Sequence, residues 1–137
     1  MVSPLWYHAA MPTHAVVWID HKEARVFHVH PESVEETTIL APQHHFHRHP
    51  KSRSGESKEH PDDAQRFHSE VARALDGADA ILIVGPSSGK LEFFKFAQEH
   101  ERRLAAKVVG VESADHPTDG EIVARAKSYF KASDRMG

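Results

Sequence analysis

The chain has 137 residues, 39% of them hydrophobic, so it can bury one core but is too short for two ordinary domains. It contains no cysteine, which excludes disulfides, thiolate zinc sites and a cysteine nucleophile. The formal net charge is −3, and no apolar stretch approaches the roughly 18 residues that a membrane-spanning helix needs. We therefore expect a cytoplasmic protein that does not associate with membranes.

The first half of the chain predicts three strands. Residues 15–20 are rich in β-forming side chains and continuous enough for a central strand that is buried on both faces. Residues 24–30 alternate along a second strand and residues 34–40 form a third, which gives an antiparallel meander. We expect residues 42–61 to form a mobile basic and histidine-rich loop, and residues 1–13 to be a disordered extension.

The second half predicts three helices. The first begins at Pro61 and ends before Gly77, and the second begins at Ser87 or Ser88. The third opens with Thr118-Asp119-Gly120-Glu121, the sequence of a capping box. Each helix has an apolar stripe that should face the core, and we expect His100 to be packed there and not catalytic. The stripes consist of Ala64, Phe67, Val71, Ala74 and Leu75, then Phe93, Phe96, Ala97, His100 and Leu104, then Ile122, Ala126 and Tyr129.

Two further strands, residues 79–84 and 107–111, separate these helices. A meander followed by right-handed βα crossovers predicts an α/β fold with a mixed five-stranded sheet and helices on both faces. Numbered along the chain, the strands should lie in the order 3-2-1-4-5, which is a ribonuclease H-like topology. We expect one domain over residues 14–131 and a short tail over residues 132–137.

The first and fourth strands should be parallel neighbours, so Asp20 and the turn Gly85-Pro86-Ser87-Ser88-Gly89-Lys90 should meet at one edge of the sheet. Asp20 lies where ribonuclease H-like nucleases hold a metal-binding carboxylate, and Glu70 could supply one partner. A pair of acids is too few for two metal ions, which favours Asp20 as a turn residue that accepts backbone hydrogen bonds.

The turn after the fourth strand invites comparison with a phosphate loop. That motif needs four residues between its glycines and a Ser or Thr after its lysine, whereas this turn has three, and Leu91 follows Lys90. Nucleotide hydrolysis is therefore not expected. Weak anion binding by the start of the helix, with Ser87, Ser88 and Lys90, stays open.

The charge of the predicted loop differs from that of the rest of the chain. Residues 41–61 carry a net charge of +2, which leaves −5 for the remaining residues because the whole chain carries −3. This contrast predicts an anionic partner for the loop and not for the whole surface. The cations of the loop are Arg48, Lys51, Arg53 and Lys58.

Histidines are also concentrated in this loop, which holds five of the 13 in the chain. In an extended conformation, His45, His47 and His49 would project on one side and could bind zinc, nickel or copper. No nearby carboxylate or fixed turn completes a tetrahedral site, so we expect at most weak zinc or nickel binding. The alternative is that the histidines and Arg48 contact phosphates, more strongly below the imidazole pKa of about 6.5.

Three segments together resemble small bacterial relatives of the middle domain of archaeal and eukaryotic peptide-chain release factors and Pelota. They are the hairpin over residues 18–26, the turn Ile83-Val84-Gly85-Pro86 and the helix start over residues 118–124. The resemblance implies association with the ribosome or RNA through the long loop. In release factors this loop carries Gly-Gly-Gln, which promotes peptidyl-tRNA hydrolysis, whereas residues 51–58 here have one glycine and no glutamine.

The residues and the resemblance together predict a non-catalytic module of the translation machinery that binds the ribosome or another structured RNA, and not DNA. Its RNA contacts would be Arg48, Lys51, Arg53, Lys58, Ser87, Ser88 and Lys90. Two enzymatic alternatives stay open, a divergent peptidyl-tRNA hydrolase and a metal-dependent hydrolase that uses the histidine cluster. A stress-related protein-interaction module is the third alternative.

Overall fold

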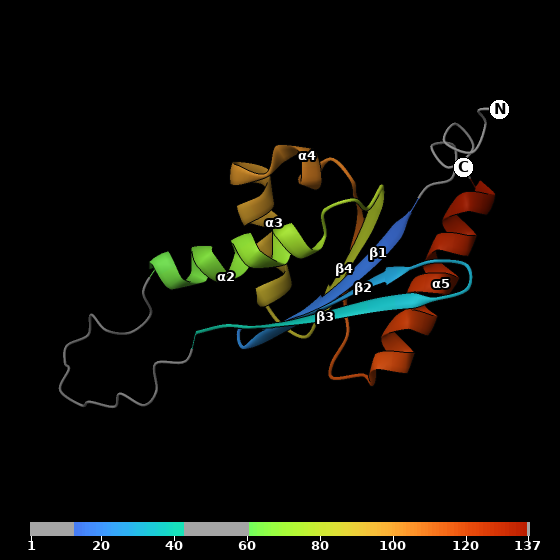
Figure 1. The fold of residues 1–137 in the computed structure, drawn as a ribbon, viewed down its shortest axis with the longest axis horizontal. Coiled ribbons are helices and arrows are strands. Elements are labelled where there is room, and N and C mark those ends of the chain that lie inside the picture. Colours follow the sequence, from blue (N-terminus) through green and yellow to red (C-terminus); the bar gives the residue numbers. More distant parts are fainter. Residues whose placement is uncertain (1–12, 43–60, 137) are drawn as a thin grey trace.

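The computed structural model describes residues 13–42 and 61–136, which form an α/β domain (Figure 1). The predicted loop and most of the predicted N-terminal extension lie outside these residues. None of the described helices is both long enough and apolar enough to cross a membrane. In chain order the elements are β1 (His14–Ile19), β2 (Glu23–Val29), β3 (Val34–Leu40), α2 (Pro61–Ala74), β4 (Ala80–Gly85), α3 (Gly89–His100), α4 (Arg102–Ala105), β5 (Val108–Ser113) and α5 (Asp119–Met136).

The five strands form one mixed sheet in the order β3-β2-β1-β4-β5, which confirms the predicted order. β1 is antiparallel to β2, with Trp18 opposite Arg25, and parallel to β4, with Trp18 opposite Val84. β3 continues the meander and β5 is parallel to β4. The strands β1, β4 and β5 therefore end at the same edge of the sheet, which we call the carboxyl edge.

β1 is buried on both faces, as its sequence predicts. Residues 15–19 are all 0% exposed. Ala15, Val17 and Ile19 pack into a cluster with α2 and α3, while Val16 and Trp18 pack into a second cluster with α5. Figure 1 shows the same arrangement, with α2 and α3 over one face of the sheet and α5 over the other. Each large side chain buried in this way stabilises the fold by about 1.5–3 kcal/mol.

The expected stripe of the first helix is correct except at its start. Phe67, Val71 and Leu75 are buried, but Ala64 is exposed. In Figure 1 the first turns of α2 reach past the ends of β1 and β4, on the side where β3 ends. Beyond α2, Gly77 has a φ of +93°, the left-handed conformation in which a glycine ends a helix without strain.

The second predicted helix is broken at Glu101, so that α3 ends at His100 and α4 follows as a single turn. Phe93 and Ala97 are fully buried, as expected. The prediction that His100 is packed in the core is wrong, since 47% of its side chain is exposed. His100 is the last residue of α3, where the helix breaks, and with Phe96 it lines a hollow of about 420 Å³ between α2 and α3.

The third helix begins with the capping box that its sequence predicts. The Thr118 amide donates to Glu121 Oε1 at 2.9 Å, and the Glu121 amide donates to Thr118 Oγ1 at 3.1 Å. Ile122 and Ala126 are buried as expected, whereas Tyr129 is half-buried and its hydroxyl donates to the Val109 carbonyl at 2.8 Å. The sequence reading missed Phe130, which is 4% exposed and completes the cluster under α5.

Gly85 ends β4 directly against β1. A Cβ atom at this position would collide with the carbonyl oxygen of Ile19, a backbone atom that cannot move aside without disturbing the central strand. Gly89 is also close to β1, since its Cβ would lie 3.1 Å from the Cα of Asp20. These two contacts keep the turn between β4 and α3 tight against the end of β1.

We expect Gly85→Ala to lower the free energy of unfolding by about 1–3 kcal/mol, the usual cost of forcing an extra carbon into a packed site. Gly120→Ala is the matched control, because no atom would lie within 4 Å of its Cβ and its φ is not positive. That variant should be unchanged or more stable by about 0.4–1 kcal/mol. Urea denaturation measures both, and equal stability of the two variants would contradict the contact.

Candidate functional site

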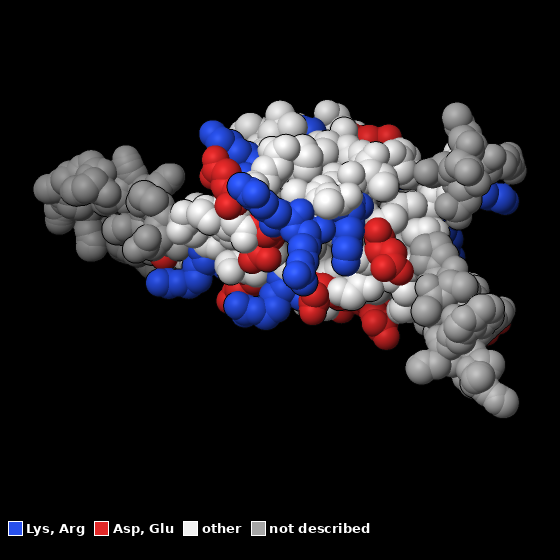
Figure 2. All heavy atoms as spheres, turned by 90° about the horizontal axis from the view of Figure 1, so that it is seen from above, with Lys and Arg blue, Asp and Glu red and all other residues white. Residues whose placement is uncertain are grey.

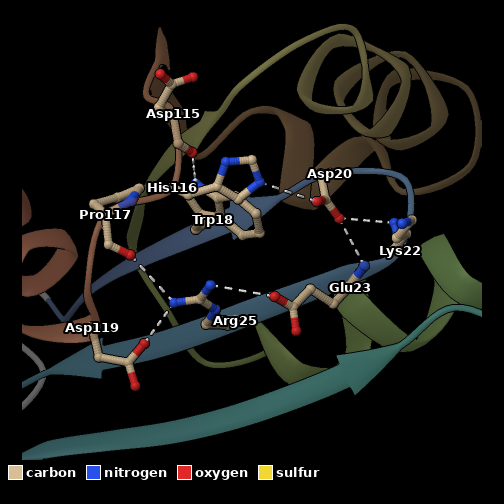
Figure 3. Close-up of polar contacts among 9 residues, drawn as sticks. All are labelled: Trp18, Asp20, Lys22, Glu23, Arg25, Asp115, His116, Pro117 and Asp119. Atoms are coloured by element: carbon tan, nitrogen blue, oxygen red, sulfur yellow. Dashed lines mark hydrogen bonds and ion pairs between the residues drawn. The ribbon is translucent and has the colours of Figure 1, made fainter.

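The carboxyl edge brings together four parts of the chain. The turn between β1 and β2 lies beside the turn between β4 and α3, because Gly89 approaches Asp20. The end of β3 lies there as well, since the Ala41 amide donates to the Lys22 carbonyl at 2.8 Å. His116, in the connection from β5 to α5, reaches the same place (Figure 3). Parallel α/β sheets usually bind their ligands at this edge, which is where the sequence predicts a site.

Asp20 organises the turn between β1 and β2. Its Oδ1 atom accepts hydrogen bonds from the amides of Lys22 at 2.8 Å and Glu23 at 2.9 Å. Its Oδ2 atom lies 3.9 Å from Nε2 of His116 (Figure 3). These contacts are those of the turn residue that the sequence favours.

The metal-binding alternative for Asp20 finds no partner in the described chain. Glu70 is exposed on α2 and makes no hydrogen bond or ion pair with Asp20. Among residues 13–42 and 61–136, the side chains include no group of three or more His, Asp or Glu that could hold a metal ion.

The turn between β4 and α3 has its lysine folded inward. Lys90 is only 9% exposed, and its Nζ atom donates to the Ser87 carbonyl at 2.5 Å. Ser87 and Ser88 are exposed. Ser88 is at the N-cap position of α3 but makes no side-chain cap hydrogen bond, and its hydroxyl instead donates to Glu92 Oε2 at 3.3 Å. The two serines are therefore accessible to a ligand, whereas Lys90 would first have to leave its carbonyl partner.

A polar cluster around Trp18 joins β1 and β2 to the start of α5 (Figure 3). The Arg25 guanidinium lies 4.7 Å from the centre of the Trp18 ring and donates to Asp119 Oδ1 at 2.8 Å and to Glu23 Oε2 at 3.3 Å. On the indole, Nε1 donates to the Asp115 carbonyl at 2.9 Å. Burial lowers the pKa of Arg25, but the hydrogen bonds and charges of Asp119 and Glu23 outweigh it and raise the pKa above its ordinary value.

Glu36, on the neighbouring strand β3, responds to the same cluster. Partial desolvation raises the pKa of this carboxyl, and the charge and hydrogen bond of Asp119 raise it further. The attraction of Arg25 opposes these effects without cancelling them. The carboxyls of Glu36 and Asp119 thus compete for one cation, which makes Glu36 easier to protonate than an isolated glutamate.

His68 forms a second cluster, between α2 and α3. Its half-buried ring lies 5.6 Å from the Phe93 ring and 5.5 Å from the Phe96 ring. Burial lowers the pKa of His68; Glu92 opposes this shift and His21 adds to it. His21 and Glu92 are themselves paired, with Nε2 and Oε1 3.2 Å apart. No local sequence signal separates His68 from the other histidines.

A hollow of about 500 Å³ lies between the end of β5 and the start of α5. Arg125 lines it but is already engaged, since it pairs with Glu112 at 3.5 Å and donates to the Ser113 carbonyl at 3.2 Å. The hollow therefore has no unpaired arginine to offer an anion. Its lining consists of Val84, Ser113, Ala114, Asp115, His116, Pro117, Glu121, Ile122 and Arg125.

The other residues that the sequence assigns to the site lie outside the described residues. They are the cations Arg48, Lys51, Arg53 and Lys58 and the histidines His45, His47 and His49. Their roles stay predictions. Among the sequence-predicted site residues, the structure brings Ser87, Ser88 and Lys90 together at the carboxyl edge.

Comparison with known proteins identifies the fold. The chain matches no protein-family model, and no curated protein matches its sequence. Among solved structures, it resembles Pelota from Archaeoglobus fulgidus over 90% of its residues, with a TM-score of 0.61 and 17% identity. The chain also resembles Pelota from Thermoplasma acidophilum over 85% of its residues, with a TM-score of 0.55 and 21% identity. An archaeal translation termination factor resembles the chain over 90% of its residues, with a TM-score of 0.56 and 14% identity.

These likenesses are too low in identity to show more than the fold. The chain spans 33% of the length of each Pelota structure and 39% of the termination factor. It therefore has the mixed five-stranded sheet of one part of these proteins, as the sequence predicts.

The cluster at His68 predicts a pH dependence of stability. Because the folded pKa is lowered, only the unfolded chain takes up this proton as the pH falls through about 6.5, so acid should reduce the free energy of unfolding. His68→Phe should lessen that loss between about pH 8 and pH 5, whereas His100→Phe, at an exposed histidine, should not. Denaturant unfolding at the two pH values measures the free energy of unfolding of each variant. An equal fall of this free energy in both variants would contradict the prediction for His68.

Proposed function

We propose that the protein binds the ribosome or another structured RNA as a non-catalytic module of the translation machinery. The observation that supports this proposal is the fold, which the chain shares over 90% of its residues with A. fulgidus Pelota and with an archaeal translation termination factor. Both comparison proteins are much longer than this chain, so their partners are carried over only as part of the proposal.

The geometry of the carboxyl edge supports the loop as the contacting element. Leu40, the last residue of β3, pairs with Glu23 at the start of β2, so the chain leaves the sheet beside the Asp20 turn. The next described element, α2, runs back from this side to the start of β4. Residues 43–60 thus connect two elements at the carboxyl edge, on the same side as Ser87 and Ser88.

Charge supports the same element. In the proposed complex, Arg48, Lys51, Arg53 and Lys58 contact phosphates and displace counterions, while the net charge of −5 on the rest of the chain gives no overall attraction to RNA. Ser87 and Ser88 add hydrogen bonds from the neighbouring turn. Lys90 joins them only after giving up its bond to the Ser87 carbonyl.

The histidines of the same segment have a secondary role in the proposal. His45, His47 and His49 add contacts to phosphates that strengthen as the imidazoles become protonated. In the proposal, zinc or nickel binding by these residues is weak and adds little to the stability of the domain, because the sequence predicts a polar loop for them and not a part of the core.

The loop contribution can be tested by a charge-matched pair of variants. Lys51→Gln with Lys58→Gln should weaken binding to ribosomes and make the plot of log affinity against log salt shallower, by up to about one unit per lost phosphate contact. Lys127→Gln with Lys131→Gln removes the same charge from exposed positions of α5 and should have little effect. A salt titration of ribosome co-sedimentation measures this, and identical slopes for the two variants would remove the loop from the interface.

Peptide release tests the non-catalytic part of the proposal. Because residues 51–58 lack Gly-Gly-Gln, the purified protein should not release peptide from ribosome-bound peptidyl-tRNA. The control is a variant without residues 51–58, in the same assay. Turnover well above that control would favour the divergent hydrolase instead.

A further inference from the structure

A groove runs between α2 and the α3–α4 segment, on the face of the sheet opposite α5. Two hollows meet in it, one of about 420 Å³ and one of about 410 Å³. Ser69 and Glu101 line both hollows, so the two lie next to each other along the groove. It extends from Arg66, near the start of α2, to Lys107, just before β5.

Cations without partners line the far half of this groove. Arg73, Arg103 and Lys107 are exposed there, and their side chains make no ion pair or hydrogen bond with any residue that the structure describes. Asp76 and Glu101 are the acids of the same hollow, so its lining carries a net positive charge. Figure 2, seen from the side of α4, shows Lys and Arg side chains gathered over the middle of this face with acidic side chains beside them.

This placement leaves a small excess of positive charge in the free protein. Three cations from separate elements are held around one hollow, and the two acids Asp76 and Glu101 offset only two of the three charges. A bound anion would balance the remaining charge, and the planar guanidinium of arginine is suited to hold two oxygens of a phosphate at once. The chemistry of the groove therefore fits a phosphate-bearing ligand.

We propose that this groove binds the phosphate backbone of a structured RNA, as a second contact surface separate from the loop. The proposal rests on the proposed function in taking RNA as the partner. The cations are spread along the groove, with Arg66 and Arg73 on α2, Arg103 on α4 and Lys107 just before β5. Arg66, which is paired with Asp63 at 3.7 Å, and Arg73, which has no ion pair among the described residues, are separated by about 10 Å of helix, at about 1.5 Å per residue, which suits successive phosphates of a strand better than one compact anion.

The near half of the groove offers a surface for bases. Phe96 and His100 line it, with their ring centres 5.0 Å apart. His100 is exposed, so its ring is accessible from the groove. Aromatic rings next to a basic track are the usual means of binding single-stranded regions of RNA without strict sequence preference.

The test compares two double variants in the full chain. Arg103→Gln with Lys107→Gln removes two cations from the groove, and Lys127→Gln with Lys131→Gln removes two from α5. Binding of ribosomes and of a fluorescently labelled hairpin RNA is measured as a function of salt. The groove variant should bind several-fold more weakly, with a slope shallower by up to about two units, while the α5 variant stays near the wild type.

Further variants separate a charge effect from a folding effect. Arg103→Lys should retain the salt slope, and circular dichroism should show the same melting for all variants because the substituted side chains are exposed. Equal affinities and slopes for the groove and α5 variants would overturn the groove proposal. If the loop variant is still weakened in that case, the proposed function survives alone.

Two further outcomes distinguish the groove proposal from the proposed function. A groove effect without a loop effect would support the groove and move the RNA contact of the proposed function away from the loop. If the wild type binds neither ribosomes nor hairpin RNA, the proposed function and the groove proposal both fall.

Discussion

β1 is shielded from water on both faces, and the positions of the other elements follow from covering it. Its side chains alternate between two apolar clusters, so one face needs α2 and α3 and the other needs α5. Its two edges are covered by β2 and β4, and Gly85 and Gly89 bring the following turn against its end. The turn after β4 is consequently held against the end of β1, and it presents the exposed Ser87 and Ser88 at the carboxyl edge, where such sheets usually bind ligands.

The polar cluster at Trp18 connects the sheet to the helix on one of its faces. Arg25 is held between the indole ring and two carboxylates, and through Asp119 it fixes the start of α5 against the sheet. Since α5 covers one face of the sheet, a single guanidinium connects the meander to the helical layer on that face. The cluster lies at the carboxyl edge, but its donors and acceptors already satisfy one another, as is usual for structural networks.

Much of the fold could be predicted from the sequence because its signals are local. A continuous β-branched run, two βα crossovers and a capping box are each readable within about ten residues, and together they determine the strand order. The candidate site could be predicted less well, because several of its contacts join residues that are far apart in the sequence. Arg25 meets Asp119 across 94 positions, Lys90 folds back onto a carbonyl, and His100 is left exposed by a break in its helix. Such contacts depend on how elements pack, which periodicity does not encode.

The outer strand β3 has a consequence for self-association. Its side chains are exposed from Val34 to Thr38, and no described strand pairs with its free edge. Glu35 and Glu36 follow one another along it, so a second copy that added to the sheet in a register placing these carboxylates opposite one another would meet repulsion. Because desolvation and Asp119 raise the pKa of Glu36, acid weakens this repulsion sooner than it would for a glutamate with an ordinary pKa. This electrostatic barrier to edge-to-edge pairing is therefore greatest at neutral and alkaline pH.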